Sequence, residues 1–329
     1  MEEKKKMMKS PSPTMFSRSW KKLEYTLNER MINTAIVKEV IETKGFPEQL
    51  PNVKEMRGMT WKLFLGFLPE DTLLWEEKEK MFKTQYQQSL DDFYYNIDYP
   101  KTKILNELQK DIKRIFPQLP FYQNEENTES VQRILFVNCV FNKSIQYVQG
   151  MHEMCALIFY VFSQQNKPKD IIEAESYCAF TTLIVRFRDW FDKAYDDKPT
   201  GLRECFKNID IVFKAYEPDL WKHLNSFNLD LTCYSFRWVS MFFLDDYEVE
   251  DVIKIWDRLL CGFGSQQIYI EIISIAVAMI VLCKDKLMKM EGNECLRELM
   301  NVHHNVELVL KRATKIKKFI ESKHIFQSQ

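Results

Sequence analysis

The sequence predicts an all-α protein, and two observations carry this prediction. Apolar residues recur at every third or fourth position through most of the chain, which is the spacing of helices that bury one face. The chain has only 8 glycines and 11 prolines in 329 residues, and no Asn-Gly or Asp-Gly pair marks a tight hairpin turn. We therefore expect helices with short connections and no sheet.

The first predicted helix covers residues 19–43. Leu23, Leu27, Ile36 and Val40 share one face of it, and Gly45 ends it. The same periodicity predicts later helices at residues 57–67, 75–95, 104–116, 130–141, 151–163, 171–192, 203–216, 220–227, 233–244, 249–260, 267–285 and 296–323. Residues 272–283 form the longest apolar run, which only Ser274 interrupts. This run is shorter than the roughly 18 to 20 residues that span a bilayer, so we expect a buried core helix.

The helices group into a main domain with flanking segments. Residues 1–18 are polar with two prolines and are expected to be a disordered tail, and residues 19–44 form an N-terminal helix. The main domain covers residues 45–285, and residues 286–329 form a C-terminal helical extension. The clustered Asp, Pro and Gly of residues 192–201 predict a hinge between a first half, 45–191, and a second half, 203–285.

The overall charge excludes some classes of partner. With 46 basic and 47 acidic residues the net charge is -1, so no global field favours binding to nucleic acid. Lysines gather at residues 1–9 and 311–318. A transient contact with an anionic membrane surface is one interpretation of these lysines, and a solvated polar end is the stronger one. No transmembrane segment is expected.

The cysteines and histidines predict neither disulfides nor a metal site. The eight cysteines occur singly, mostly in apolar stretches, with no CxxC pair and no secretory signal, as in the reduced thiols of a cytoplasmic protein. The five histidines have no partner at metal-ligand spacing. The chain also lacks a GxxxxGK[ST] loop, so it should bind no nucleotide by itself.

Arg114 stands out in the predicted helix at residues 104–116. Leu108 and Ile112 lie on the apolar side of this helix, and Arg114 lies on the other side. Asp111 precedes it by three residues, a spacing at which a carboxylate can steer the guanidinium. A simpler interpretation is a cation that offsets the helix dipole, and from this segment alone it is the stronger one.

Gln149 is a second polar residue that a core does not explain. It lies in QYVQGMHEM, after a polar turn and before a nearly apolar run, so it should lie near a helix start. Gly150 beside it keeps the backbone uncrowded. The simpler alternative is that its amide caps free backbone N–H groups, and neither polar residue decides the function alone.

Five motifs together carry more information than either residue. They are Arg57-x-x-x-Trp61, Leu108-x-x-Asp-x-x-Arg114, Tyr147-x-Gln149, Tyr234-Ser-Phe-Arg-Trp238 and Val252-Ile-Lys-Ile-Trp-Asp257. In this order and at these separations, residues 45–285 resemble the TBC-domain activators of Rab-type small GTPases. Two positions depart from that family: Leu108, where the family more often has Ile, and His152, where it usually has Asn.

The resemblance implies a TBC-domain fold of two packed helical subdomains, the first of them catalytic. It implies a GTPase activator with no substrate turnover of its own, acting on a GTP-bound Rab partner that carries the GTP and Mg²⁺. Arg114 would stabilise transition-state charge and Gln149 would orient the attacking water in trans. Four supporting residues would hold the two loops, and Gly150 would let the partner approach. The four are Asp111, Arg57, Trp61 and Tyr147.

Two other functions remain open at this stage. A non-catalytic TBC scaffold would bind a GTPase or another protein without accelerating hydrolysis, and it would need neither Arg114 nor Gln149. A helical adaptor unrelated to GTPases would require the five motifs to coincide by chance. For the leading hypothesis we expect a monomer in the cytoplasm, peripheral at endomembranes, that regulates vesicle traffic.

Overall fold

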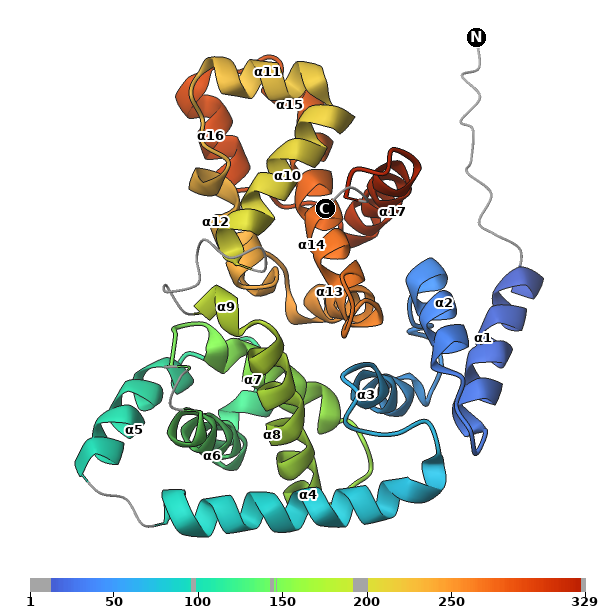
Figure 1. Ribbon diagram of the computed structural model, residues 1–329, viewed down its shortest axis with the longest axis vertical. Helices are drawn as coiled ribbons and strands as arrows, with labels where there is room; N and C mark the ends of the chain where they lie inside the picture. Colours follow the sequence, from blue (N-terminus) through green and yellow to red (C-terminus); the bar gives the residue numbers. More distant parts are fainter. Residues whose placement is uncertain (1–12, 96–98, 143–144, 146, 192–200, 327–329) are drawn as a thin grey trace.

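The structure is a computed structural model that describes residues 13–95, 99–142, 145, 147–191 and 201–326. Figure 1 shows two stacked groups of helices, a lower layer that ends with α9 and an upper layer that starts with α10. Within the described residues the regular elements are helical, and the β-type pairing is one isolated bridge between Met31 and Asp71. The prediction of an all-α fold with two packed helical subdomains is confirmed.

The lower layer is formed by the first nine α-helices and their short turns. The helices are α1 (Pro13–Asn28), α2 (Thr34–Lys44), α3 (Val53–Phe64), α4 (Trp75–Ser89), α5 (Tyr99–Ile112), α6 (Glu125–Phe141), α7 (Met151–Phe162), α8 (Lys169–Arg186) and α9 (Arg188–Phe191). The turns are η1 (Thr72–Leu74), η2 (Leu90–Tyr94) and η3 (Pro120–Gln123). Helix α4 runs along the bottom of this layer, and α1 and α2 lie at its side (Figure 1).

The upper layer continues from α10 to α17. Its helices are α10 (Leu202–Tyr216), α11 (Pro218–Ser226), α12 (Thr232–Ser240), α13 (Val249–Cys261), α14 (Gln267–Leu282), α15 (Lys284–Leu287), α16 (Gly292–Met300) and α17 (Val306–Ser322). One 3-10 turn, η5 (Leu244–Asp246), joins α12 to α13. Helices α14 and α17 pack against each other along much of their length.

The single helix predicted at residues 19–43 is wrong, because the segment forms two helices. Helix α1 ends at Asn28, and Asn33 begins α2 by accepting a hydrogen bond from Ile36 N at 3.2 Å. Between them Ile32 N donates to Glu70 O at 2.9 Å, so the break pairs with the segment before η1. The apolar period continues across the break, which hid the asparagine cap from a count of apolar residues.

Two further boundaries differ from the prediction at the ends of the chain. Residues 13–18, predicted as part of a disordered tail, belong to α1, while residues 1–12 lie outside the described residues. The helix predicted at residues 296–323 is two helices, α16 and α17, and Asn305 caps the second by accepting from Leu308 N at 3.2 Å. The predicted hinge at residues 192–201 falls almost entirely outside the described residues.

The longest apolar run of the sequence is a buried core helix, as predicted. Helix α14 is buried from Ile272 to Val281 with exposures of 3% or less. In the part of the chain that the structure describes, no helix is both long and apolar enough to cross a membrane. The neutral side chains of α14 instead fill the space between α10, α13 and α17.

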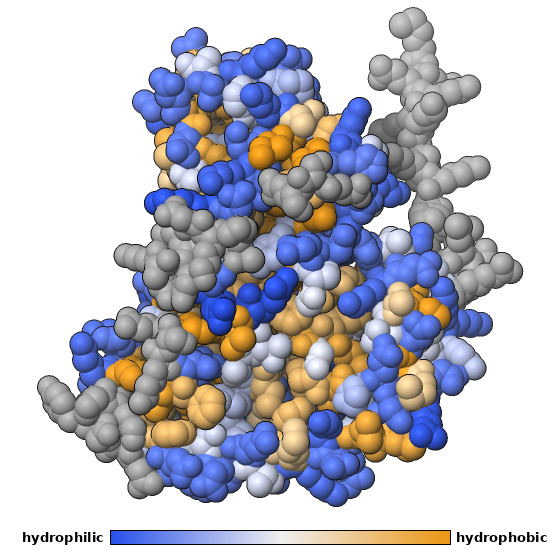
Figure 2. Space-filling view, in the orientation of Figure 1, coloured by the Kyte–Doolittle hydropathy of each residue, from blue (hydrophilic) through white to orange (hydrophobic). Residues whose placement is uncertain are grey.

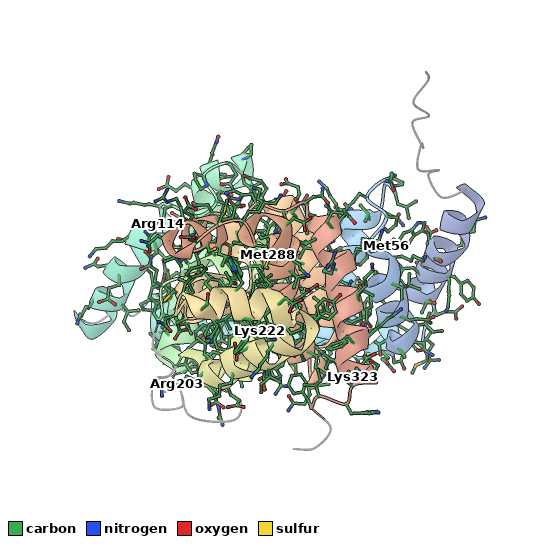
Figure 3. The ribbon with its side chains drawn as sticks, turned by 90° about the horizontal axis from the view of Figure 1, so that it is seen from above. Met56, Arg114, Arg203, Lys222, Met288 and Lys323 are labelled. Carbon is green, nitrogen blue, oxygen red and sulfur yellow. The ribbon has the colours of Figure 1, made fainter. Side chains whose placement is uncertain are left out.

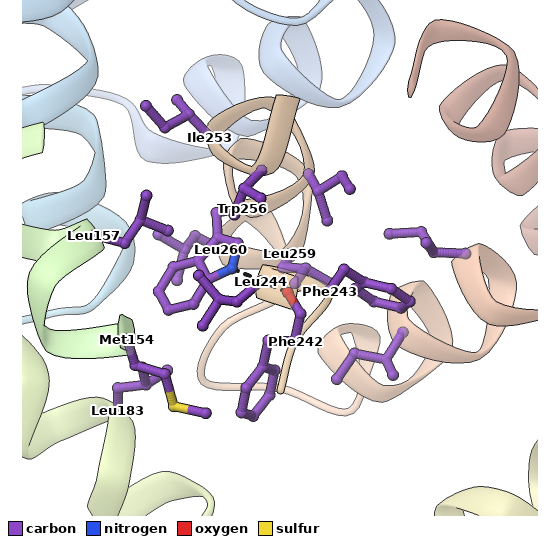
Figure 4. Packing of buried hydrophobic residues seen from close by; sticks show 14 of the residues in the cluster. Met154, Leu157, Leu183, Phe242, Phe243, Leu244, Ile253, Trp256, Leu259 and Leu260 are labelled. Atoms are coloured by element: carbon purple, nitrogen blue, oxygen red, sulfur yellow. Dashed lines mark hydrogen bonds between the residues drawn. The ribbon is translucent and has the colours of Figure 1, made fainter. Parts of the chain in front are cut away.

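An apolar interface joins the two layers. Figure 4 shows Met154 and Leu157 of α7 facing the turn and helix that carry Phe242, Trp256 and Leu260. All five are buried, and the Trp256 indole N–H donates to Phe242 O at 3.2 Å. Burial of this much apolar surface fixes the layers against each other, because each large side chain contributes about 1.5 to 3 kcal/mol.

A buried charged network ties the last helix to the second. Arg258 of α13 donates to Glu271 of α14 at 2.6 Å and to Thr314 of α17 at 3.1 Å. Lys317 of α17 lies 3.6 Å from the same Glu271 carboxylate and also pairs with Glu42 of α2. The four charged groups therefore join α2, α13, α14 and α17, which are far apart in the sequence.

The face seen in Figure 2 mixes polar and apolar side chains, with hydrophilic ones over much of the upper layer and the edges and apolar ones across the middle of the lower layer. All eight cysteines are free thiols, as predicted, and five of them are buried. Cys233 is exposed, so the prediction of core cysteines does not extend to that position.

Candidate functional site

Arg114 lies in a turn directly after α5. The predicted helix at residues 104–116 is too long by one turn, since α5 ends at Ile112. Phe116 takes a positive φ of 33°, and it is buried beside the Tyr122 ring at a centroid distance of 6.2 Å. This reversal before Pro117 leaves Arg114 pointing outward, with 55% of its side chain exposed. The guanidinium pairs with the Asp111 carboxylate.

Gln149 lies in the loop before α7. Gly150 begins the helix in the left-handed region, with φ of 104°, so the chain turns sharply and leaves Gln149 exposed. Within the described part of the chain the Gln149 carboxamide forms no hydrogen bond, and no side chain caps the start of α7. The simpler interpretation, in which Gln149 caps the helix, is therefore wrong.

One carboxylate joins the turn of Arg114 to the loop of Gln149. Asp111 pairs with Arg114 through Oδ1 and accepts a hydrogen bond from the Tyr147 hydroxyl at 2.6 Å through Oδ2. Partial burial opposes ionisation of this carboxyl, but the hydrogen bonds from Tyr147 and Arg114 hold the pKa of Asp111 below its usual value. The structure thus places the Arg114 turn against the segment that contains Tyr147 and Gln149.

Arg57 and Trp61 do not lie with these residues. In Figure 3, Met56, which precedes Arg57, lies on the opposite side of the molecule from Arg114. Both residues of the motif instead bind Asp257 of α13: Arg57 Nε donates at 3.0 Å and Trp61 Nε1 at 2.7 Å. Their direct contacts therefore join α3 of the lower layer to α13 of the upper layer.

Aromatic rings pack against this pair, and Arg57 also pairs with the Glu48 carboxylate. The Trp61 ring stacks on Trp256 at 5.8 Å, and the Arg57 guanidinium lies 4.8 Å from the Phe46 ring centre. Burial raises the pKa of Asp257 to about 6, although the Arg57 charge opposes this rise. The sequence identified the segment that contains Asp257 but assigned it no role, because its partners lie about 200 positions away.

Gly150 has two structural requirements. Its φ of 104° disfavours any side chain, and a Cβ built there would lie 2.0 Å from Met241 Cε. Gly150 itself is buried in the free protein. The close approach of a partner at this residue therefore stays a prediction. Met241 follows α12, which means that the upper layer contacts the Gln149 loop directly.

A cavity of about 430 Å³ opens beside Arg114. Carboxylates of both layers line it, among them Glu153 of α7 and Asp245 of η5. Burial and a hydrogen bond with Asp245 raise the pKa of Glu153 to about 8, so Glu153 keeps its proton at neutral pH. The sequence did not indicate this pair, because it forms only when the two layers meet.

No metal centre is evident in this region. Among the residues that the structure describes, no three His, Cys, Asp or Glu side chains are grouped as ligands for a metal ion. In this region Arg114 supplies a cation, Gln149 supplies an amide, and the Asp111 carboxylate pairs with Arg114. Such a pair can stabilise developing negative charge and orient a water molecule on a bound partner.

The comparison with protein families matches most of the chain. The family model described as the Rab-GTPase-TBC domain matches residues 54–288, which include the Arg114 turn, the Gln149 loop and the Asp257 contact. The chain is 24% identical over 327 residues to human "TBC1 domain family member 5", covering 79% of this chain and 41% of that protein. It is also 24% identical over 224 residues to "GTPase-activating protein GYP1" of Saccharomyces cerevisiae, covering 62% and 34% respectively.

Two solved structures have the same fold. The crystal structure of the Ypt/Rab-GAP domain of Gyp1p aligns with a TM-score of 0.77 at 20% identity, over 92% of this chain and 98% of that chain. The TBC domain of a Chlamydomonas flagellar RabGAP aligns with a TM-score of 0.64 at 17% identity, over 92% of both chains. The chain spans between 34% and 41% of the length of the two curated relatives named above.

Proposed function

Because this chain belongs to the Rab-GTPase-TBC domain family, we propose that it is a GTPase-activating protein for a Rab-type small GTPase in its GTP-bound form. A relative that bears the name "GTPase-activating protein" supports this proposal, although the chain covers only 34% of that protein. The observation that carries it furthest is the pair of exposed side chains, Arg114 and Gln149, on two turns joined by Asp111 and Tyr147.

Arg114 is the cationic finger of the proposed mechanism. GTP hydrolysis spreads negative charge over the γ-phosphoryl oxygens, and an arginine supplied in trans accelerates it by about 10³ to 10⁵. A planar guanidinium can span two oxygens and keeps its charge when water is excluded. The Asp111 carboxylate restricts the conformations of Arg114 before the partner binds, which lowers the entropy cost of placing it.

Gln149 is the amide finger. A neutral carboxamide both donates and accepts, so it can hold the attacking water with a lone pair directed at phosphorus. The Gln149 side chain is exposed and forms no hydrogen bond with the described residues. Its C=O and NH₂ groups are therefore both free for that task. Gln149 then acts in place of a glutamine of the GTPase itself.

The other components come from the partner. The nucleotide and Mg²⁺ belong to the GTPase, and the activator has no cofactor of its own. We propose that the chain acts as a monomer in the cytoplasm, with transient contacts at endomembranes, and that it regulates vesicle traffic by returning its Rab to the GDP-bound form. The basic segment of α17 is one surface that can meet anionic lipid.

A phosphate-release assay with a panel of GTP-loaded Rab proteins tests this function. The wild-type chain should accelerate at least one Rab, and Arg114→Ala and Arg114→Lys should each remove nearly all stimulation, by about 10³-fold or more for Ala. Lys113→Ala is the matched control, because it removes a neighbouring exposed cation. Equal rates for wild type and Arg114→Ala would contradict the assignment of the finger.

The same panel separates an activator from a scaffold. A scaffold would bind a GTP-loaded Rab without accelerating phosphate release, and the Arg114 and Gln149 variants would bind it equally well. Stimulation by the wild-type chain that depends on both residues excludes that alternative.

A further inference from the structure

His152 lies where the two sides of the Gln149 loop meet. It is the second residue of α7, and only 3% of its side chain is exposed. Its Nδ1 atom lies 3.3 Å from the Gly150 backbone nitrogen and 3.1 Å from the Tyr147 hydroxyl oxygen. Tyr147 and Gly150 flank Gln149, so one imidazole nitrogen contacts both sides of the loop.

The contact with Gly150 fixes the protonation state of the ring. A backbone N–H only donates, so the Nδ1 atom that receives it must carry a lone pair, and the proton of the neutral ring is on Nε2. The Gly150 N–H belongs to the peptide group that directly follows the Cα atom of Gln149. Its hydrogen bond to His152 therefore fixes the plane of that peptide group and the direction of the Gln149 side chain.

The Tyr147 hydroxyl already donates its proton to another acceptor, Asp111. Its single proton points to Asp111 Oδ2 at 2.6 Å, so its oxygen faces His152 Nδ1 as an acceptor. An imidazolium would donate from Nδ1 to this oxygen and lose the bond from Gly150, since two N–H groups cannot bond each other. Protonation would thus replace the hydrogen bond from Gly150 with a hydrogen bond to Tyr147.

The charged groups around His152 come from three parts of the fold. Asp111 Oδ2 of α5 lies 4.0 Å from Nδ1, and Glu153 Oε1 of α7 lies 3.8 Å from Nε2. Asp245 of η5 and Arg114 act over longer distances. Burial lowers the pKa of His152, Asp111 and Asp245 raise it, and Arg114 lowers it, with a net value below the usual one. The ring is therefore neutral at neutral pH.

We propose that neutral His152 is the positioning residue of the glutamine finger, and that protonation of its ring releases the peptide plane that presents Gln149. This inference rests on the proposed function. The bond that the imidazolium gains is to the Tyr147 oxygen, whose proton stays on Asp111, so the same protonation leaves the support of the arginine finger in place. The activator is then inhibited by acid through its own loop, independently of the GTPase.

Three variants test this role in the phosphate-release assay between about pH 5.5 and 8. His152→Ala should lower kcat by about 3- to 10-fold, the effect of one lost hydrogen bond, with KM changed by less than about twofold. His152→Asn should restore kcat at neutral pH, because an amide oxygen can accept from Gly150, and it should remove the loss of activity in acid. His303→Asn is the control, since His303 is an exposed histidine of the cavity beside Arg114.

The inference is overturned if wild type and His152→Asn lose activity equally in acid, or if His152→Ala changes KM alone. Melting temperatures of the variants show whether a lost activity is only unfolding. Dividing each rate by that of His303→Asn at the same pH removes the pH dependence of the GTPase.

A second measurement needs no GTPase. With only 8 glycines in the chain, selective ¹⁵N-glycine labelling resolves the Gly150 amide by NMR. Its proton shift should titrate with His152 in the wild type and stay constant in His152→Asn. A Gly150 signal that does not follow His152 refutes the inference. Titration without stimulation of any Rab would instead refute the proposed function while the loop contact stands.

Discussion

The indole N–H of Trp61 donates a 2.7 Å hydrogen bond to Asp257, across the boundary between the lower and upper layers. The same carboxylate accepts from Arg57 Nε at 3.0 Å, so one buried anion holds both residues of the first sequence motif. A buried carboxylate is tolerated only when its charge and lone pairs are satisfied. The motif therefore sets how the two layers meet.

Replacing Trp61 should destabilise the whole molecule. Trp61 is fully buried, and Trp61→Ala should lower the free energy of unfolding by about 3 to 5 kcal/mol. Trp61→Phe keeps most of the ring but loses the hydrogen bond, and it should cost about 1 to 3 kcal/mol. Urea unfolding measures both. A Trp61→Ala variant with an unchanged unfolding midpoint would show that the contact is dispensable.

Asp111 and Tyr147 should affect activity more than stability. Tyr147→Phe leaves Asp111 Oδ2 without its donor, and Asp111→Asn removes the charge that holds Arg114, so each should lower kcat by about 3- to 30-fold. The double variant should lose less than the product of the two effects, because the residues share one contact. A loss in kcat equal to the product of the two single losses would mean that the residues act separately.

A GTPase that lacks its own switch glutamine tests Gln149 directly. If Gln149 orients the water in trans, a Rab with that glutamine changed to leucine should still be stimulated by the wild-type chain. Gln149→Ala should lose stimulation of both forms of the Rab. Val148→Ala, at an exposed neighbouring position, is the control. Complete loss of stimulation with the altered Rab would place the water-orienting amide on the GTPase.

Glu153 should make stability depend on pH. Burial and Asp245 raise the pKa of Glu153 from 4.5 to about 8, so the folded state holds a proton that the unfolded state releases. This contribution is complete below about pH 4.5 and is lost as the pH rises through 8.

Glu153→Gln cannot lose that proton, so it should become more stable than the wild type by about 1 to 3 kcal/mol as the pH rises to 9. Thermal unfolding at several pH values measures this difference. Glu248→Gln, at an exposed carboxylate of the same cavity, should show no such trend. Parallel curves for wild type and Glu153→Gln would mean that Glu153 does not hold this proton in the folded state.

Much of the fold could be predicted from the sequence, and the errors have one physical origin. Helices with a continuous apolar face, such as α7 and α14, were located to within a few residues. The breaks at residues 29–33 and 301–305 were missed, because the apolar period continues through them and the caps are single asparagines, Asn33 and Asn305. Periodicity reports which residues are buried and is less informative on where a helix stops.

The candidate site was predicted less completely. Arg114, Asp111, Tyr147 and Gln149 fall within two short segments, and the structure joins those segments. Arg57 and Trp61 were assigned to the same loops because they belong to the same family pattern, yet their partner is Asp257. A family sequence motif gives the order of residues along the chain, but it does not show which side chains are in contact in the fold.

The charged network between α2 and α17 has a consequence for work with shorter fragments. The segment matched by the family model, residues 54–288, contains Arg258 and Glu271 but neither Lys317 nor Glu42. Cutting the gene at those limits would expose the apolar side of α14 and leave Glu271 without one of its two cations. The boundaries by which the domain is detected are thus narrower than those of the unit that packs as one body.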